Sequence, residues 1–379
     1  MKYVCAVCFS LLLSAAAVAQ NQFVYTDDET APNEVSAAKI NADGSLTQIA
    51  GSPFATGGTG GGGWVEGLAT ATAGKNSYLY VDNGGDGTIS GLKIDPANGA
   101  LRPVPRSPFL ADGIAGNYSL AISPSNRFLF ASSDATTLIH VYAISQTNGS
   151  LFEVKGSPFL ANANLDGLKV SGNGHFLIAG GQSNSAVAVF SISQAGALTE
   201  VPGSPFPASG TVSAVESNCA SNQVFAVSNS TNLIDAYKLS AAGTLTPAPG
   251  SPFSNGASGN GPNSFDLVLS PTNHFLFTTD SFTDEISSFA VAPDAALMPV
   301  AGSPFFASSW TSGTAITHAG DYLYAVDFSD AAVLGEHVNS DGSLTPAPGP
   351  FNTGAISTVG EMNTVITFPS PVCPTVSTQ

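Results

Sequence analysis

Short apolar runs, each bounded by turn-forming residues, recur along the whole chain. Residues 118–159 show one complete unit: "YSLAISP" (118–124), "FLFASS" (128–133), "LIHVYAIS" (138–145) and "LFEVKGSPF" (151–159), with turns such as "SPSN" and "TNGS" between them. Short runs rich in β-branched and aromatic residues are typical of strands joined by tight turns. The unit therefore predicts four consecutive antiparallel strands, which we call A, B, C and D.

The phrase that ends this unit occurs seven times. The other copies are "LTQIAGSPF" ending at Phe54, "LRPVPRSPF" at Phe109, "LTEVPGSPF" at Phe206, "LTPAPGSPF" at Phe253, "LMPVAGSPF" at Phe305 and the shortened "LTPAPGPF" at Phe351. The prolines of successive copies are 55, 50, 47, 47, 52 and 46 residues apart. Periods of this size are typical of propeller blades or helical arrays, and the strand-like content excludes the arrays. The repeats therefore predict an all-β, seven-bladed β-propeller with four-stranded antiparallel blades.

The two ends of the chain predict how the ring closes. The first repeat begins at "FVYTDD" (23–28), which is a B strand, so its blade lacks strand A. After the last phrase, "AISTVGEMNTVITF" (355–368) is an A strand without a blade. We therefore expect the C-terminal strand to complete the N-terminal blade, which removes an exposed sheet edge.

The repeated phrase is best interpreted as part of the architecture. Strand D is the outer edge of each blade, where proline is tolerated and discourages pairing between molecules. The glycine allows the bend that follows, and the phenylalanine can pack between neighbouring blades.

The 379 residues, with 40 Gly and 25 Pro, fit a single large unit of short strands and many turns. Residues 1–19 are typical of a secretory signal: Lys2, an apolar stretch from Val4 to Leu13, and small residues ending at Ala19. The apolar stretch is shorter than the roughly 20 residues of a spanning helix. We expect a signal peptide (1–19), a propeller (20–368) and a C-terminal tail (369–379), exported to the periplasm or the exterior.

Without the signal peptide the chain has 9 Lys and Arg against 27 Asp and Glu, because Lys2 is the only charged residue removed, and its net charge is −18. A surface this acidic repels nucleic acid and anionic membranes. It also disfavours a phosphorylated substrate unless the few cations gather in one place. We expect a small molecule, such as a sugar lactone, or an envelope protein as the partner of a monomer.

The blade pattern resembles the seven-bladed propeller lactonases, the 6-phosphogluconolactonase-like family, and the exported propeller-repeat proteins related to it. The resemblance covers nearly all of the mature chain and rests on three segments. These are "DNGGDGTISGLKIDPANGAL" (82–101), "AISPSNRFLFASSDATTLIHVYAIS" (121–145) and "DLVLSPTNHFLFTTDSFTDEISSFAV" (266–291). It implies the propeller fold and, for members that are enzymes, hydrolysis of a lactone.

Lactonases of this family tend to carry His near the start of strand A, with Arg and Glu on the same face, to polarise the lactone and activate water. The corresponding positions here are Glu66, Tyr118, Asp166, Ser213, Phe265 and roughly Gly313. None of them is histidine. The first hypothesis is therefore a binding propeller without the family's catalytic histidines, and the alternative is a lactone hydrolase that uses carboxylates. A purely structural surface protein is a third hypothesis, which the sequence does not rank.

Glu66 and Asp166 are the candidate catalytic residues, because both begin A strands and face the same end of the propeller. Two carboxylates there could do acid–base work or bind a cation. The favoured alternative is a solvated polar lining of the channel. Convergent carboxylates would favour a hydrolase, and scattered ones a binding protein.

The candidate ligand-binding residues gather at the same mouth of the channel. They are Trp64, Tyr118, Ser213, Phe265 and Trp310. Trp64 and Trp310 suit stacking on a sugar, and packing within the blades is the alternative. Trp64 follows the Gly-rich stretch 57–63, which lacks the Lys-Ser/Thr of a phosphate-binding loop and precedes a strand.

The loops between strands B and C are acidic and emerge on the same face as the D-to-A loops. "DNGGDG" (82–87) is compatible with calcium, but it lacks EF-hand spacing and a closing Glu, so a turn without metal is favoured. We expect no required cofactor, with Ca²⁺ or Mg²⁺ as the open alternative. The histidines form no cluster that would favour zinc, so no metal ligand is assigned.

Cys219 and Cys373 are the two cysteines of the mature chain. Both are predicted at the face opposite the acidic loops, where a disulfide would pin the closing strand, and two free thiols are the alternative. Lys169 and Glu216 lie at equivalent positions of adjacent A strands, and we interpret them as an ion pair between blades.

Overall fold

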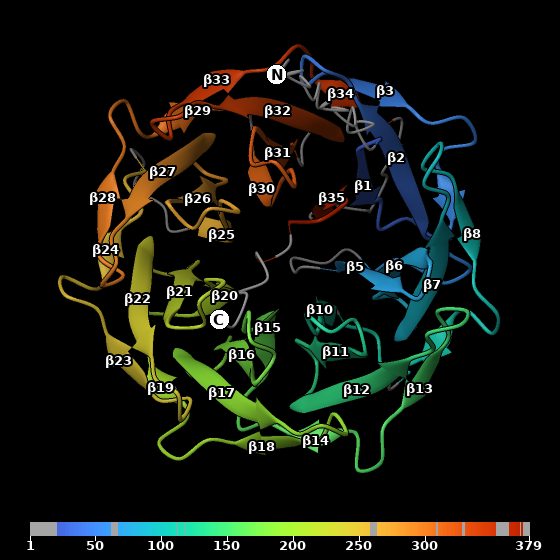
Figure 1. The fold of residues 1–379 in the computed structure, drawn as a ribbon, viewed down its shortest axis with the longest axis horizontal. Helices are drawn as coiled ribbons and strands as arrows, with labels where there is room; N and C mark the ends of the chain where they lie inside the picture. The colour runs from blue at the N-terminus through green and yellow to red at the C-terminus, as the bar shows by residue number, and fades with distance from the viewer. Residues whose placement is uncertain are drawn as a thin grey trace, which may run out of the picture.

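Seven β-sheets are arranged around a common axis in the computed structural model (Figure 1). The structure describes residues 21–61, 67–111, 113–116, 118–257, 264–307, 310–327, 330–353, 364–371 and 373. Every regular element within these residues is a strand. No described segment forms a helix long and apolar enough to cross a membrane. The predicted seven-bladed propeller is confirmed.

The strands are numbered in chain order, and each blade repeats the same four steps. The innermost A strands are β5 (Leu68–Ala73), β10 (Tyr118–Ile122), β15 (Leu165–Val170), β20 (Val212–Ser217), β25 (Ser264–Leu269), β30 (Thr311–Ile316) and β35 (Val365–Phe368). The B strands are β1 (Phe23–Asp27), β6 (Asn76–Asn83), β11 (Phe128–Ser133), β16 (Phe176–Gly181), β21 (Gln223–Ser228), β26 (Phe275–Asp280) and β31 (Tyr322–Asp327).

The outer half of each blade consists of strand C and a divided strand D. The C strands are β2 (Glu34–Ile40), β7 (Thr88–Ile94), β12 (Leu138–Ile144), β17 (Ala186–Ile192), β22 (Leu233–Leu239), β27 (Glu285–Val291) and β32 (Ala332–Val338). The first D pieces are β3 (Leu46–Gln48), β8 (Leu101–Pro103), β13 (Leu151–Glu153), β18 (Leu198–Glu200), β23 (Leu245–Pro247), β28 (Leu297–Pro299) and β33 (Leu344–Pro346). The second pieces are β4 (Phe54–Ala55), β9 (Phe109–Leu110), β14 (Phe159–Leu160), β19 (Phe206–Pro207), β24 (Phe253–Ser254), β29 (Phe305–Phe306) and β34 (Phe351–Asn352).

The division of strand D is a feature of the blade that the sequence pattern does not predict. Both pieces pair with the same C strand, and the repeated phrase forms the break between them. The serine of the repeated phrase replaces the backbone acceptor that is lost at the break. Its hydroxyl accepts the C-strand N–H that has no backbone partner. Ser52, for example, accepts the Ala37 N–H at 2.9 Å. The same contact recurs at Ser107, Ser157, Ser204, Ser251 and Ser303 at 2.9–3.0 Å.

The hydrophobic core is divided into seven clusters, one between each pair of neighbouring blades. The phenylalanine of the repeated phrase is a buried member of two clusters, as Phe109 is between the second and third blades, and it packs partly buried against the other five. This confirms the predicted packing role of that residue. Burial of an aromatic side chain at every interface stabilises the ring as a whole.

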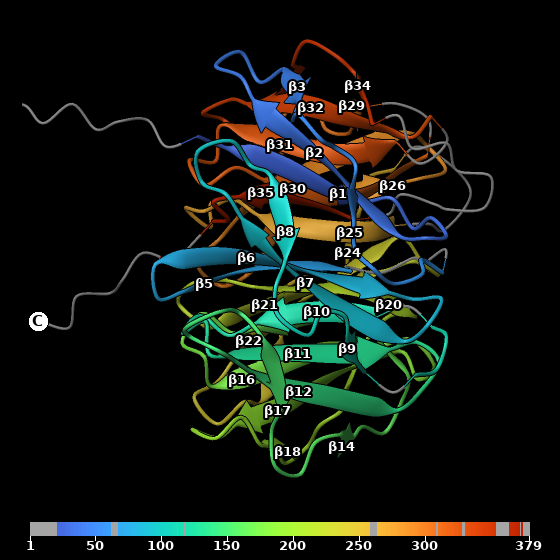
Figure 2. The same cartoon turned by 90° about the vertical axis from the view of Figure 1, so that its right-hand side faces the viewer.

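The ring closes as predicted, by pairing between the two ends of the chain. β35 is antiparallel to β1, with Phe368 opposite Phe23 and Val365 opposite Thr26. Blade 1 therefore consists of β35 and β1–β4, and blades 2 to 7 follow in chain order. We call the face that carries the B–C and D–A loops the upper face, and the opposite face, with the A–B and C–D turns, the lower face (Figure 2).

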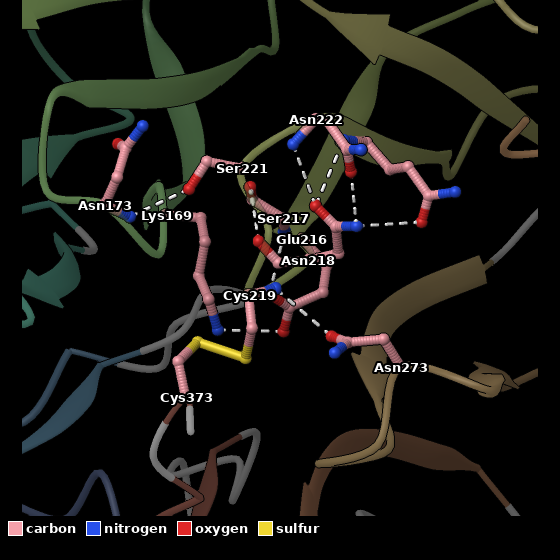
Figure 3. The surroundings of a disulfide bond; sticks show 11 residues. Lys169, Asn173, Glu216, Ser217, Asn218, Cys219, Ser221, Asn222, Asn273 and Cys373 are labelled. Atoms are coloured by element: carbon pink, nitrogen blue, oxygen red, sulfur yellow. Dashed lines mark hydrogen bonds and ion pairs between the residues drawn. A yellow bond between two sulfur atoms is a disulfide. The ribbon is translucent and has the colours of Figure 1, made fainter. Parts of the chain in front are cut away.

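The lower face holds a disulfide between Cys219 and Cys373 (Figure 3). Cys219 lies in the A–B turn of blade 5 and Cys373 follows β35 of blade 1, so the bond ties the closing strand to a distant blade. Lys169 Nζ lies 2.8 Å from Glu216 Oε2 beside the disulfide, which confirms the predicted ion pair between blades 4 and 5.

Candidate functional site at the upper end of the axis

Four of the innermost strands are irregular near their upper ends. The pairing register shifts between Asp166 and Leu168 in β15, Val212 and Ala214 in β20, Ser264 and Leu267 in β25, and Thr311 and Thr314 in β30. A β-bulge at the rim of a sheet redirects the side chain that it contains. The positions chosen from the sequence in these four strands, including Asp166, Ser213 and Phe265, all fall at the bulges.

Asp166 is the described candidate with the most perturbed chemistry. It is 3% exposed, and its Oδ2 accepts a hydrogen bond from Gln182 Nε2 at 3.1 Å. Its Oδ1 is buried without a hydrogen-bond partner in the described part of the chain. Burial, and to a smaller extent the charge of Asp134, raises the pKa of Asp166 to about 7. A carboxyl group with this pKa can gain or lose a proton near neutral pH.

The other sequence candidates have different environments. The Ser213 hydroxyl donates to the Ser264 carbonyl at 2.9 Å, so it joins two neighbouring A strands. Phe265 is partly buried in β25. Trp310 is 40% exposed, and its ring lies 5.9 Å from that of Phe282 on the upper face. Tyr118 is the first residue of β10.

The predicted residues Glu66 and Trp64 lie outside the described residues. The part of the Gly-rich loop that is described, residues 57–61, runs between the B–C loops of blades 1 and 2. The Gly60 N–H donates to the Thr30 carbonyl at 2.8 Å, and the Gly61 N–H donates to Glu29 Oε2 at 2.9 Å. A Cβ at Gly60 would collide with the Glu29 backbone, so only glycine allows this approach.

Most buried carboxylates of the upper face accept hydrogen bonds from nearby loops or from a neighbouring strand. Asp280 Oδ1 accepts the Phe282 and Thr283 N–H groups, both at 3.1 Å. Both oxygens of Asp235 bind Ser209 at 2.8 Å. Asp266 Oδ2 accepts the Thr314 N–H at 2.6 Å. These carboxylates lie apart from one another, and each is hydrogen-bonded to other protein groups. This arrangement favours a binding protein over a hydrolase with convergent carboxylates.

One group of acids differs from the rest and was not predicted. Asp27, Glu29 and Asp82 come together at the interface of blades 1 and 2, with one carboxylate oxygen of each within 4.8 Å of the others. The sequence signal is the matching position of Asp27 in "FVYTD" and Asp82 in "YLYVD". Asp86 does not join this group. Its carboxylate accepts the Thr88 hydroxyl at 2.6 Å and the Thr59 N–H at 3.0 Å.

Buried oxygens without a hydrogen-bond partner also concentrate in the inner strands. In the described chain they include Asp27 Oδ2, Ser119 Oγ, Asp166 Oδ1 and Thr279 Oγ1. Ser119 and Asp166 have equivalent register positions in neighbouring A strands, opposite Ser132 and Gly180. Buried polar groups usually bind protein, ordered water or a ligand. The described residues therefore leave the hydrogen-bonding capacity of this layer unfilled.

The cations of the described chain are absent from its upper end. The described Lys and Arg residues lie towards the lower face or at the outer edge, where acids are also present: Lys39, Lys75, Lys93, Arg102, Arg106, Arg127, Lys155, Lys169 and Lys238. The upper half carries acids: Asp27, Asp28, Glu29, Glu34, Asp82, Asp86, Asp134, Asp166, Asp235, Asp266, Asp280, Asp284, Glu285, Asp327 and Asp330. A ligand that approaches the upper face therefore meets a negative potential.

The histidines lie away from the upper end of the axis. His175, His274 and His318 are in A–B turns, and His337 is near the lower end of β32. His140 Nδ1 lies 3.1 Å from Glu153 Oε1, between strands C and D of blade 3. Histidine therefore contributes little to the chemistry of this region.

The fold defines the class of the protein as a seven-bladed β-propeller. Residues 68–215 match the family model described as "Lactonase, 7-bladed beta-propeller", so the resemblance inferred from the repeats is confirmed and this part of the chain is similar to that family. No curated protein sequence matches the chain.

Solved structures show the same architecture over almost the whole chain. A candidate 6-phosphogluconolactonase from Bacteroides uniformis is 15% identical, with a TM-score of 0.75, covering 92% of this chain and 99% of its own. The periplasmic gluconolactonase PpgL of Pseudomonas aeruginosa is 16% identical, with a TM-score of 0.72, covering 92% and 98%. At these identities the likeness shows the fold.

Proposed function

We propose that this chain is an exported propeller that binds a small uncharged polar molecule, of the sugar-lactone class, at the upper end of its axis. The observation that carries the proposal is the layer of buried, unpaired oxygens in the inner strands, above all Ser119 Oγ and Asp166 Oδ1. Such oxygens are suited to the hydroxyl groups of a sugar derivative, which can donate to them. The periplasmic gluconolactonase among the structural neighbours supports the same class of ligand.

The charge distribution supports a neutral ligand. A phosphate group needs Arg, Lys or a cluster of backbone N–H groups, and the cations of the mature chain lie towards the lower face or the outer edge. The Gly61 N–H in the Gly-rich loop already donates to the Glu29 carboxylate. The ligand that fits this face is therefore an unphosphorylated lactone.

Export is supported by the covalent chemistry of the lower face. Disulfides form and persist in oxidising compartments, and Cys219 is bonded to Cys373. The apolar N-terminal stretch of the sequence supports the same compartment.

Hydrolysis of the lactone is a second candidate function, and the pKa of Asp166 favours it. A buried carboxylate with a pKa of about 7 can act as a general base that takes a proton from the attacking water. The turnover of such an enzyme would rise as the pH increases through about 7, because the base works in its deprotonated form.

Calorimetric titration with gluconolactone, alongside proton release in a pH-stat, separates the two functions. We expect heat of binding by the mature protein and a loss of affinity of about tenfold or more in Asp166→Asn, whose amide replaces one acceptor by a donor. Asp235→Asn is the matched control, because Asp235 is a buried upper-face carboxylate whose two oxygens accept the N–H and the hydroxyl of Ser209. This variant should keep the wild-type affinity.

Each outcome has a definite meaning. A folded protein that binds none of a panel of neutral sugar lactones contradicts the proposed function. Proton release above the buffer rate that is lost in Asp166→Asn establishes a hydrolase. Turnover that survives this substitution rules out Asp166 as the base.

A further inference from the structure

Three buried carboxylates from two neighbouring blades meet at the upper ends of β1 and β6. Asp27 ends β1, Glu29 follows it in the B–C loop of blade 1, and Asp82 lies near the end of β6. Their exposed fractions are 0%, 8% and 1%. Three acids this close together and this far from water need a compensating positive charge or bound protons.

We propose that Asp27, Glu29 and Asp82 bind one divalent cation, and that this cation is calcium. The independent observation is Asp27 Oδ2, which is completely buried and accepts no hydrogen bond in the described chain. Buried carboxylate oxygens are normally satisfied by donors. An oxygen that lacks a donor and lies beside two other carboxylates has the environment of a metal ligand.

Gly67 shows that the free oxygen faces the other acids. A Cβ at this position would overlap Asp82 Oδ1 and would lie 3.7 Å from Asp27 Oδ2. The two oxygens therefore face the same space, which is open because Gly67 has no side chain. The Gly67 carbonyl also accepts the Asp82 N–H at 3.0 Å, which fixes the strand that carries this aspartate.

The acids repel one another without a cation. Burial, followed by the charges of Glu29 and Asp82, raises the pKa of the Asp27 carboxyl well above its usual value. A divalent cation would reverse this effect, because it stabilises the ionised carboxylates that surround it.

The three acids are not part of the pattern that repeats in every blade. Asp27 and Asp82 occupy the same position in the B strands of adjacent blades. The equivalent residues of the other five blades are uncharged: Ser132, Gly180, Val227, Thr279 and Val326. The fold therefore does not require a carboxylate at this position, and the pair has a local role.

Ligand chemistry favours calcium. Carboxylate oxygens are hard ligands, which suit calcium and magnesium better than zinc. Magnesium usually keeps several waters and is bound through one or two carboxylates, whereas calcium accepts several carboxylates in a flexible geometry. Three carboxylates that meet between two blades therefore favour calcium.

The test is calorimetric titration of the calcium-free mature protein with CaCl₂ and, separately, with MgCl₂, in the absence of lactone. We expect one calcium ion per chain, magnesium binding at least about tenfold more weakly, and a higher Tm in calcium than in EGTA, because the ion binds only the folded state. Asp82→Asn should weaken calcium binding at least about tenfold.

Asp86→Asn is the matched control, because Asp86 lies in the B–C loop directly after Asp82 but binds Thr59 and Thr88. It should keep wild-type calcium affinity. A wild-type protein that shows neither heat nor a change in Tm with calcium overturns the proposal. The proposal is also overturned if Asp86→Asn abolishes binding while Asp82→Asn does not. Because no lactone is present, these results are independent of the proposed function.

A second measurement tests the free oxygen directly. In EGTA, Asp27→Asn should be at least as stable as the wild type, because it removes a carboxyl group whose ionised form has no counter-ion. In calcium, only the wild type should gain stability. A loss of stability in EGTA would assign Asp27 a structural role instead.

Discussion

Glu336, in the C strand of blade 7, is a carboxyl group whose acidity is changed by burial alone. The residue is 5% exposed, and burial raises its pKa from 4.5 to about 7. The folded state therefore holds a proton that the unfolded chain releases at lower pH. The resulting stability is fully present below pH about 4.5 and is lost as the pH rises through about 7.

Glu336→Gln should remove this dependence on pH. At pH 8 the variant should have a higher free energy of unfolding than the wild type, by about 1–3 kcal/mol, because the amide needs no proton to remain neutral. At pH 4 the difference should be close to zero. Urea unfolding at both pH values measures it. A difference that is the same at both would show that burial of the charge is not its cause.

At the scale of one element, the repeated phrase replaces a continuous D strand by two short pieces and a hydroxyl group. The serine accepts the C-strand N–H at the break in six blades. In blade 7, Gly349 stands at the position of the serine. The break thus keeps the sheet hydrogen-bonded while proline interrupts the outer edge.

Ser251→Ala should lower the free energy of unfolding by about 1 kcal/mol. The substitution leaves the N–H of the buried Ala236, now 2.9 Å from Ser251 Oγ, without its acceptor. Chemical denaturation measures the loss. The control is Ser254→Ala directly after the phrase, since Ser254 is exposed and its hydroxyl accepts the Gly256 N–H of its own loop. An equal loss in both variants would contradict the role of the phrase serine.

The strands could be predicted because each is encoded by a local apolar pattern. The observed bounds of β11 equal those of "FLFASS" (128–133). The break in strand D could not be predicted in this way, because it depends on a hydroxyl reaching across to a neighbouring strand. The grouping of Asp27, Glu29 and Asp82 could not be predicted from a local pattern either. Asp27 and Asp82 are distant in sequence, and only the alignment of blades 1 and 2 brings them together.

At the scale of the whole molecule, the closing strand is held in two ways. β35 pairs with β1 through four residues, and the segment that follows it is bonded to blade 5 through Cys373. The disulfide joins residues 154 positions apart, so it restricts a large part of the unfolded chain.

Replacement of both cysteines, Cys219→Ser with Cys373→Ser, should lower the free energy of unfolding by about 2–5 kcal/mol. Thermal unfolding with and without reductant measures the effect. Reductant should lower the Tm of the wild type towards that of the double variant and should leave the variant unchanged. A wild-type Tm that is insensitive to complete reduction would show that strand pairing alone closes the ring.

The acids of the upper face together lead to a prediction about ligand selection. It depends on their summed field and not on any single residue. The field of the upper acids acts on any ligand before contact, and it opposes an added negative charge. A sugar lactone that carries a phosphate should therefore bind more weakly than its neutral counterpart. The difference should shrink as salt is added, because the screening length falls from about 30 Å at 0.01 M to about 8 Å at physiological ionic strength. Calorimetric titration of both lactones at the two ionic strengths measures this. A phosphorylated lactone that binds more tightly at low salt would place the ligand against the cations of the lower half instead.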